Sequence, residues 1–210
     1  MSGVVAAIVS ARGVPFLSRE FDGCDLVLAG SYGLEIIYPD IEATIDGRAA
    51  AARRSLDRAF TRLSDRLDDC AGTILEHHGY TLCVHYHLVS TGCRPRIKEL
   101  IADVGKDFPD LAVRNLPTSY EIVPPGDWTK ADSLSTIALN YKLNDSDRTL
   151  TIFAGDSPAD EPAFEWANAR AGVSIKVGAS DNTSAQYCVS TPSDLIEVLE
   201  CLWRMRGPVA

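Results

Sequence analysis

The sequence TLTIFAGDSPADEPAF, residues 149–164, joins a buried strand to a helix through an acidic loop. The apolar run from Thr149 to Ala154 predicts the strand, and the residues from Glu161 to Ala169 predict the helix. Ligands of open α/β sheets bind at the carboxyl ends of strands, which is where Asp156 lies. The stretch therefore predicts an α/β fold with a site in this loop.

Strands and helices alternate through residues 1–42 and 124–210, which predicts a parallel sheet covered by helices. The predicted strands cover residues 4–9, 26–29, 173–177 and 187–189, with a hairpin strand at 36–38, and further helices cover residues 130–141 and 193–205. We interpret these two parts of the chain as one Rossmannoid core.

Residues 43–123 follow a different order: helix, strand, strand, helix, strand, strand. The apolar residues of the first helix, Gly47 to Cys70, recur at helical spacing, and its arginines lie elsewhere on the helical wheel. The other predicted elements cover residues 73–77, 80–87, 94–107, 111–115 and 120–123. Such a module can bury one face of its sheet under two helices. We therefore predict an inserted α+β cap domain.

The composition excludes several classes of partner. The formal net charge is -9, so the chain lacks the basic face that nucleic-acid backbones require. No apolar run approaches the ~20 residues that cross a bilayer, and the apolar start lacks the basic residues of a signal peptide. The six cysteines are scattered, which is typical of free thiols. We expect a cytoplasmic protein that binds neither nucleic acid nor membrane; the sequence does not indicate its oligomeric state.

The acidic loop offers a metal site. Asp156 and Asp160 lie four residues apart, and such carboxylates can hold Mg²⁺ directly or through its waters. The alternative is that Asp160 caps the following helix and Glu161 favours its first turn. The local sequence leaves both interpretations open.

Two further residues fit a phosphate site. Lys130 opens a predicted helix, where the macrodipole disfavours a cation unless it faces a phosphate or a carboxylate. Ser10 follows the first predicted strand, and its hydroxyl can donate to a phosphate oxygen. Taken alone, a surface lysine is usually just solvated, and the signal from Ser10 is weak.

Polar residues of the predicted cap form another cluster. Strand alternation places His85 and His87 on one face, and Glu76 lies on the neighbouring predicted strand. These residues could bind zinc, but hydrogen bonds to a sugar or a phosphate suit them better. Glu121, on the last predicted strand, could accept hydrogen bonds from sugar hydroxyls or lie on a solvated face.

Five segments, taken in order, resemble motifs of the trehalose-phosphate phosphatases, a family of the haloacid dehalogenase superfamily. Residues 5–12 resemble V-A-I-V-S-G-R, residues 29–35 G-x-H-G-x-E, residues 75–87 E-x-K-x-x-S-L-A-V-H-Y-R, residues 120–131 x-E-I-x-P-x-G-x-x-K-G, and residues 155–164 G-D-D-x-T-D-E-x-x-F. The match runs nearly from end to end, and the ordered set is more specific than any one motif. The fold it implies is a haloacid-dehalogenase-like core with an inserted cap.

The resemblance implies Mg²⁺-dependent hydrolysis of trehalose 6-phosphate to trehalose and phosphate. Ser10 would hydrogen-bond the phosphoryl group and Lys130 would neutralise its developing charge. Asp156 would bind Mg²⁺, and Asp160 would support the waters of the metal. The substrate-binding residues it implies are Arg12, Glu76, His85, His87 and Glu121.

The chain departs from the family at the nucleophile. The D-x-D-G-T motif, whose first aspartate attacks phosphorus, is absent from the 210 residues. In the superfamily its strand lies between those that end here at Ser10 and Asp156, so we expect a core without its first strand and an incomplete, inactive copy. The alternatives are a non-catalytic sugar-phosphate-binding or regulatory descendant and a phosphatase of another sugar phosphate. Single substitutions in the other motifs are Ala11, Tyr32, His87, Ala131, Ser157 and Ala159.

Overall fold

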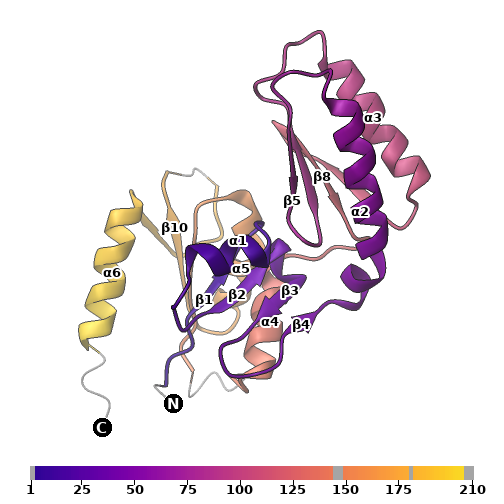
Figure 1. The fold of residues 1–210 in the computed structure, drawn as a ribbon. Helices are drawn as coiled ribbons and strands as arrows, with labels where there is room; N and C mark the ends of the chain where they lie inside the picture. The colour runs from indigo at the N-terminus through magenta and orange to yellow at the C-terminus, as the bar shows by residue number, and fades with distance from the viewer. Residues whose placement is uncertain (1–2, 144–148, 180–181, 206–210) are drawn as a thin grey trace. The chain divides into compact units, whose positions relative to one another are not determined.

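The computed structural model describes residues 3–143, 149–179 and 182–205 (Figure 1). Contacts within the chain group it into two compact units, residues 6–128 and residues 1–5 with 129–210. Each unit contains strands and helices, and parallel strands occur in both. The α/β class predicted from the sequence is therefore confirmed, and each unit is described by itself below.

Residues 6–128 begin with a four-stranded sheet in the order β1-β2-β3-β4. Its elements are β1 (Ala7–Val9), α1 (Val14–Glu20), β2 (Val27–Gly30), the 3-10 helix η1 (Ser31–Gly33), β3 (Glu35–Ile37) and β4 (Thr44–Ile45). β1 and β2 are parallel, and the remaining pairs are antiparallel. The strand predicted at residues 4–9 is thus present but shorter, and the hairpin of β2 and β3 is confirmed.

The helix α1 was not predicted from the sequence. Gly13 precedes it in an extended conformation, Pro15 stands in its first turn, and the helix buries Val14 and Leu17. A proline in the first turn costs no hydrogen bond, because those backbone N–H groups have no partner within the helix. Seven residues make only two turns, which is too short for helical periodicity to show in the sequence.

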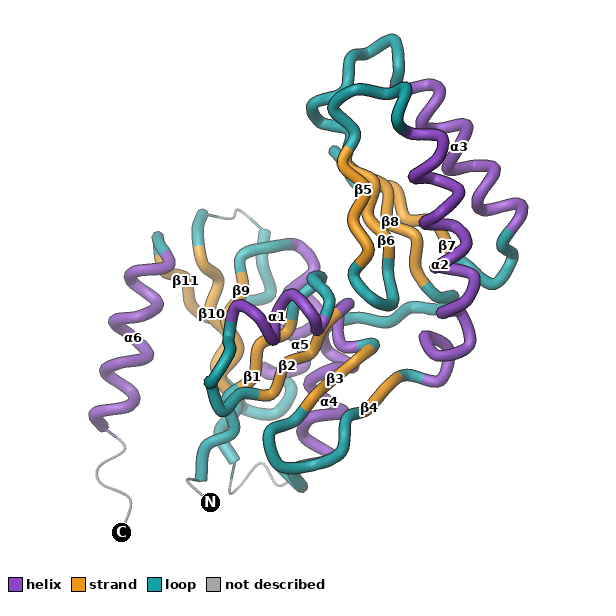
Figure 2. The backbone as a smooth tube through the Cα atoms, in the orientation of Figure 1, coloured by secondary structure: helices purple, strands orange, loops and turns teal. Residues whose placement is uncertain are grey.

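The same unit continues with a sheet in the order β5-β6-β8-β7, whose strands are all antiparallel. Its elements are α2 (Gly47–Leu67), β5 (Ile74–His77), β6 (Leu82–His85), α3 (Arg94–Asp107), β7 (Ala112–Asn115) and β8 (Ser119–Val123). Both helices cover one face of this sheet (Figures 1 and 2). The order of elements is the one that the sequence predicts.

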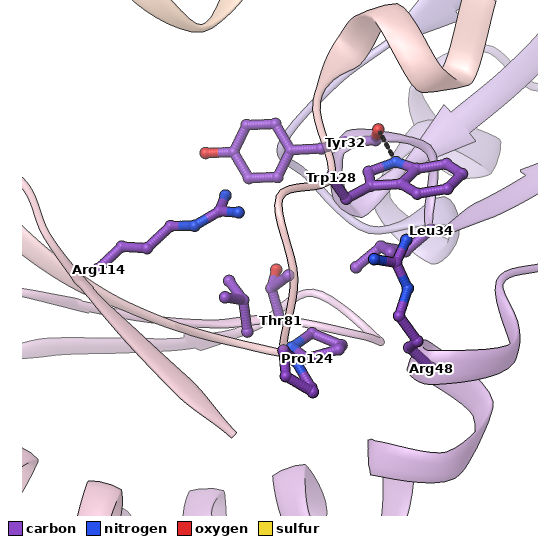
Figure 3. Close-up of a pocket in the computed structure, with 9 residues that line it drawn as sticks. Tyr32, Leu34, Arg48, Thr81, Arg114, Pro124 and Trp128 are labelled. Carbon is purple, nitrogen blue, oxygen red and sulfur yellow. Dashed lines mark hydrogen bonds between the residues drawn. The ribbon is translucent and has the colours of Figure 1, made fainter. Parts of the chain in front are cut away.

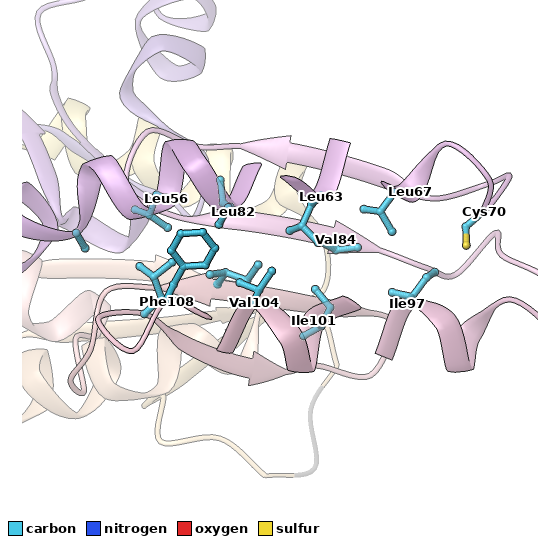
Figure 4. Packing of buried hydrophobic residues seen from close by; sticks show 14 of the residues in the cluster. Leu56, Leu63, Leu67, Cys70, Leu82, Val84, Ile97, Ile101, Val104 and Phe108 are labelled. Atoms are coloured by element: carbon cyan, nitrogen blue, oxygen red, sulfur yellow. The ribbon is translucent and has the colours of Figure 1, made fainter. Parts of the chain in front are cut away.

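Apolar residues at helical spacing explain why α2 and α3 cover the sheet. Leu56 and Leu63 of α2 and Ile97 of α3 are at most 1% exposed, and they pack with strand residues such as Leu82 and Val84 (Figure 4). Burying each of these side chains stabilises the fold by roughly 2 kcal/mol. Because side chains alternate along a strand, the neighbours of these strand residues point to the opposite face of the sheet.

The second unit holds a three-stranded parallel sheet in the order β11-β10-β9. Its elements are α4 (Lys130–Asn140), β9 (Ile152–Gly155), the 3-10 helix η2 (Pro158–Asp160), α5 (Glu161–Asn168), β10 (Val173–Val177), β11 (Tyr187–Val189) and α6 (Pro192–Met205). Helix α5 packs on β9, β10 and α4. Phe153 and Phe164 form its core, with ring centroids 5.6 Å apart and an interplanar angle of 65°.

Within the described residues, β1 has only β2 as a strand neighbour and β9 has only β10, so each lies at the edge of its sheet. Both strands end in the loops that the sequence marks as candidate sites. No helix in the described ranges is long and apolar enough to span a membrane.

Candidate functional site

The loop after β9 is fixed by the Asp160 side chain. The Oδ2 atom of Asp160 accepts hydrogen bonds from the Ser157 backbone N–H at 2.8 Å and from the Ser157 hydroxyl at 2.7 Å. These bonds form a capping box around η2, immediately before α5 begins at Glu161. The prediction that the Asp160 side chain caps the following helix is therefore wrong: it makes no cap bond to α5, because its Oδ2 is used by Ser157 at the start of η2.

The other oxygen holds Lys130. The Lys130 ammonium donates to Asp160 Oδ1 at 2.5 Å, and the two side chains are only 12% and 1% exposed. Burial raises the pKa of Asp160, but the hydrogen bond and charge of Lys130, together with the bonds from Ser157, outweigh it and lower that pKa below its usual value. Asp160 therefore stays ionised and fixes the position of a cation.

Gly155 is required by this arrangement. A Cβ atom at Gly155 would lie 2.3 Å from Asp160 Cγ, which is closer than any real contact of that kind. The absence of a side chain at the end of β9 thus lets the Asp160 carboxylate sit directly against the strand.

The start of α4 fixes the backbone of Lys130. Thr129 precedes the helix, and both its backbone N–H and its hydroxyl donate to the Asp132 carboxylate at 2.8 Å. Asp132 also places negative charge in the first turn, which the helix dipole favours. Lys130 is the first residue of the helix, where the helix dipole disfavours a cation. The Asp160 carboxylate compensates for this, as the sequence analysis predicted for a lysine at this position.

Asp156 is the residue of this loop that remains available to a ligand. It is exposed, and its carboxylate accepts no hydrogen bond from the part of the chain that the structure describes. Its backbone carbonyl accepts a hydrogen bond from the buried Lys176 ammonium at 2.6 Å. Lys176 lies on β10, and no local pattern in the sequence indicated its role.

Of the two predicted metal-binding residues, Asp156 and Asp160, only one is free to bind Mg²⁺ directly. Both Asp160 oxygens are engaged by Lys130 and Ser157, so only the Asp156 carboxylate can be a direct ligand without breaking a bond. Mg²⁺ often keeps several waters and binds through one or two carboxylates plus substrate phosphate oxygens. No cluster of three or more His, Cys, Asp or Glu residues that could hold a metal occurs in the described ranges, so an all-protein cage does not form there.

In residues 6–128, the loops after β1 and β2 interlock. The Ser10 backbone N–H donates to the Ala29 carbonyl at 2.9 Å, and the Ser10 carbonyl accepts from the Tyr32 N–H at 2.8 Å. The Ser31 N–H donates to the Arg12 carbonyl at 2.9 Å, and the Arg12 N–H donates to the Ser10 hydroxyl at 3.1 Å. The predicted phosphate-binding serine is therefore held by backbone bonds on both sides, and its hydroxyl proton is left for another acceptor.

Glu76 contacts two of the other predicted substrate-binding residues, Arg12 and His85. Its carboxylate accepts from the Arg12 guanidinium and lies 2.8 Å from His85 Nε2 and 3.5 Å from His78 Nε2. Burial raises the pKa of Glu76, but the hydrogen bonds from His85 and Arg12 and the nearby positive charge outweigh it and lower that pKa. His87 follows the end of β6, with its ring centroid 6.1 Å from that of His85.

The face of the second sheet that α2 and α3 leave open carries a polar row. The pairing register aligns Glu76 with Cys83, Cys83 with Glu121, and Glu121 with Arg114, across all four strands. Glu76 and Glu121, predicted separately from sequence, are thus on one face, together with His85. The sequence analysis missed Arg114, whose guanidinium donates to the Gly126 carbonyl at 3.3 Å. Burial raises the pKa of the Cys83 thiol to about 11, so this thiol stays protonated.

Tyr32 is a second residue that the sequence analysis did not assign. Its hydroxyl donates to Glu121 Oε1, and its carbonyl accepts from the Trp128 indole N–H at 2.8 Å (Figure 3). Tyr32 and Trp128 line a small pocket together with two arginines, Arg48 and Arg114. The Arg48 guanidinium lies 5.3 Å from the Trp128 ring centroid. The one sequence feature that could have indicated a role for Tyr32 is that it replaces the histidine of the G-x-H-G-x-E motif.

The fold is that of the haloacid dehalogenase-like hydrolases. A solved hydrolase of this type from Bacteroides thetaiotaomicron matches with a TM-score of 0.63 at 16% identity, over 95% of this chain and 85% of that one. A solved trehalose-6-phosphate phosphatase related protein matches with a TM-score of 0.79 at 20% identity, over 96% of this chain and 82% of that one. Both likenesses concern the fold.

The sequence identifies the family within this class. The model of the trehalose-phosphatase family matches residues 2–193, and the chain belongs to that family. The trehalose-phosphate phosphatase of Mycobacterium avium (strain 104) is 29% identical over 205 residues, which cover 93% of this chain and 51% of that protein. The chain thus spans about half the length of the curated relatives it matches. The resemblance found in the five motifs is confirmed.

Proposed function

We propose that this chain binds trehalose 6-phosphate and takes part in its Mg²⁺-dependent hydrolysis to trehalose and phosphate. Family membership supports the substrate. The observation that carries the proposal is the Lys130 ammonium held by the buried Asp160 carboxylate, in the same unit as the exposed Asp156 at the end of β9. Phosphoryl transfer depends mainly on positioning and on positive charge, and this arrangement supplies both.

The residues have distinct tasks in this proposal. Lys130 neutralises negative charge on the phosphoryl oxygens, and the Ser10 hydroxyl donates a hydrogen bond to one of them. Asp156 would hold Mg²⁺, which when bound would supply further positive charge to the phosphoryl group. Asp160 acts through Lys130, because both of its oxygens are already engaged. On the sugar side we propose Arg12, Glu76, His85, His87 and Glu121.

Hydrolysis also needs a nucleophile. The 210 residues contain no D-x-D-G-T motif, so turnover by this chain alone requires another carboxylate. Binding of a sugar phosphate without turnover is therefore the second candidate function. The cytoplasmic location stays a prediction.

The experiment measures phosphate release from trehalose 6-phosphate by the purified chain with Mg²⁺, beside Asp156→Asn. Calorimetric titration with the same ligand measures binding, and circular dichroism verifies folding. Binding without phosphate release supports the second candidate, and release abolished by Asp156→Asn supports hydrolysis by this chain. A folded chain that binds only sucrose 6-phosphate or glucose 6-phosphate contradicts the proposed substrate.

A further inference from the structure

The loop between β2 and β3 holds two consecutive residues in an unusual backbone conformation. Ser31 has a φ of 50° and Tyr32 a φ of 60°. Neither is glycine, and left-handed backbone is energetically unfavourable for such residues. The surrounding structure must therefore hold both residues in place.

Ser31 anchors this loop to the turn between β5 and β6. It is fully buried, and its hydroxyl donates to the His78 carbonyl at 2.6 Å. The backbone at Gly13 also comes very close to this turn: a Cβ atom at Gly13 would lie 2.3 Å from the same His78 carbonyl oxygen. The anchored backbone then directs the Tyr32 side chain.

The Tyr32 side chain reaches the open face of the sheet, where its hydroxyl donates to Glu121 Oε1. Glu121 is only 7% exposed, and its other oxygen, Oε2, accepts no hydrogen bond from the described part of the chain. Burial and the charge of Glu121 both raise the pKa of Tyr32, so the phenol keeps its proton and remains the donor. One oxygen of this carboxylate is thus fixed, and the other is left to accept from a ligand.

We propose that Tyr32 is a positioning residue that orients Glu121 to accept a hydrogen bond from a sugar hydroxyl, and so sets the preference for a disaccharide phosphate over phosphate alone. The inference rests on the proposed function, because it names the sugar-facing part of the same site. A carboxylate with one oxygen already fixed can accept a hydrogen bond from a hydroxyl without losing further rotational freedom, which favours binding. Arg114 lies beside Glu121 in the register, and its guanidinium points toward the Tyr32 ring (Figure 3).

Tyr32→Phe tests this role because it removes the hydroxyl and keeps the ring. Dissociation constants are measured by calorimetry for trehalose 6-phosphate and for inorganic phosphate, with EDTA present so that no Mg²⁺-dependent turnover competes. We expect the constant for trehalose 6-phosphate to rise about tenfold or more and the constant for inorganic phosphate to change less than twofold, since a hydrogen bond to a charged group is lost only on the sugar side. Tyr187→Phe, which alters an exposed tyrosine, is the matched control and should change neither constant.

A double variant separates positioning from direct contact. If Tyr32 acts through Glu121, then Tyr32→Phe adds nothing to the loss caused by Glu121→Gln. An unchanged trehalose 6-phosphate constant in Tyr32→Phe overturns the inference, as does equal weakening of both ligands or loss of folding, because each indicates no role or a general structural role. If the unaltered chain binds trehalose 6-phosphate no more tightly than inorganic phosphate, the proposed function itself fails.

Discussion

The Lys130–Asp160 ion pair gives the sharpest test of how this fold holds its site. Asp160→Asn preserves the size of the side chain and an acceptor for Ser157, but it removes the charge that faces Lys130. Breaking a buried ion pair at one partner costs about 3–5 kcal/mol. With its single oxygen facing Ser157, the asparagine turns its amide NH2 toward Lys130, but the Lys130 side chain is 12% exposed and can still reach water. We therefore expect unfolding free energy to fall by about 2–3 kcal/mol, a large part of the usual 5–15 kcal/mol of a folded protein.

Urea unfolding followed by circular dichroism measures this change. Lys130→Met is the companion variant, and it should cost about 3 kcal/mol because it leaves a buried carboxylate without its cation. The double variant has no charge left unpaired, so its cost should be at least about 1.5 kcal/mol smaller than the sum of the two single costs. The matched control is Glu200→Gln on α6, which breaks an exposed ion pair with Arg204 and should cost less than about 0.5 kcal/mol.

Two results refute this reasoning. If Asp160→Asn costs no more than Glu200→Gln, the buried pair contributes nothing that an exposed pair lacks. If the costs of the two single variants simply add in the double variant, then Lys130 and Asp160 do not stabilise each other, and the carboxylate serves only in the capping box of η2.

Three further predictions concern the same elements. Gly155→Ala should displace the Asp160 carboxylate and lower the unfolding free energy by about 2 kcal/mol or more, measured by urea unfolding; a cost below about 0.5 kcal/mol would contradict the close approach at 2.3 Å. Leu82→Ala should cost about 2–5 kcal/mol in the same assay, because Leu82 is fully buried beneath the helices of the second sheet. The thermal midpoint should fall as the pH drops below the ordinary His78 pKa of 6.5 and again below the ordinary Glu76 pKa of 4.5, because burial of His78, and the partners of Glu76, lower the folded pKa of each below its unfolded value. The unfolded chain then binds more protons, so stability present above those values is lost as the pH falls through the folded pKa; in scanning calorimetry, a midpoint unchanged between pH 7.5 and 4 would contradict these shifts.

Much of the fold could be predicted because its strands and helices have strong periodic patterns. The order of elements in residues 43–123 follows from helical spacing around Leu56 and Leu63 and from short β-rich runs between turn residues. The sequence grouped His85 and His87 with Glu76 on the neighbouring strand, and in the structure His85 Nε2 lies 2.8 Å from the Glu76 carboxylate and 6.1 Å separate the His85 and His87 ring centroids. The helix α1 escaped prediction because seven residues carry too little periodicity.

The site was less predictable, since its decisive contacts join distant parts of the chain. Tyr32 and Glu121 are 89 residues apart, and nothing in a serine followed by a tyrosine signals left-handed backbone. Spacing alone left Asp160 either as a cap or as a residue supporting a metal. The side-chain geometry shows a third arrangement, in which one oxygen accepts from Ser157 in the capping box of η2 and the other holds Lys130.

Because motif residues can have structural roles, a match to the motif does not by itself indicate catalysis. Gly155 and Asp160 both belong to the G-D-D-x-T-D-E-x-x-F resemblance, yet each has a structural task here: the glycine makes room for the carboxylate, and the carboxylate fixes η2 and Lys130. A chain that only binds its ligand needs these two residues as much as an enzyme does, because without them the loop after β9 loses its shape. Their presence therefore predicts a preserved phosphate-binding geometry, whereas turnover depends on a nucleophile that these two residues do not provide.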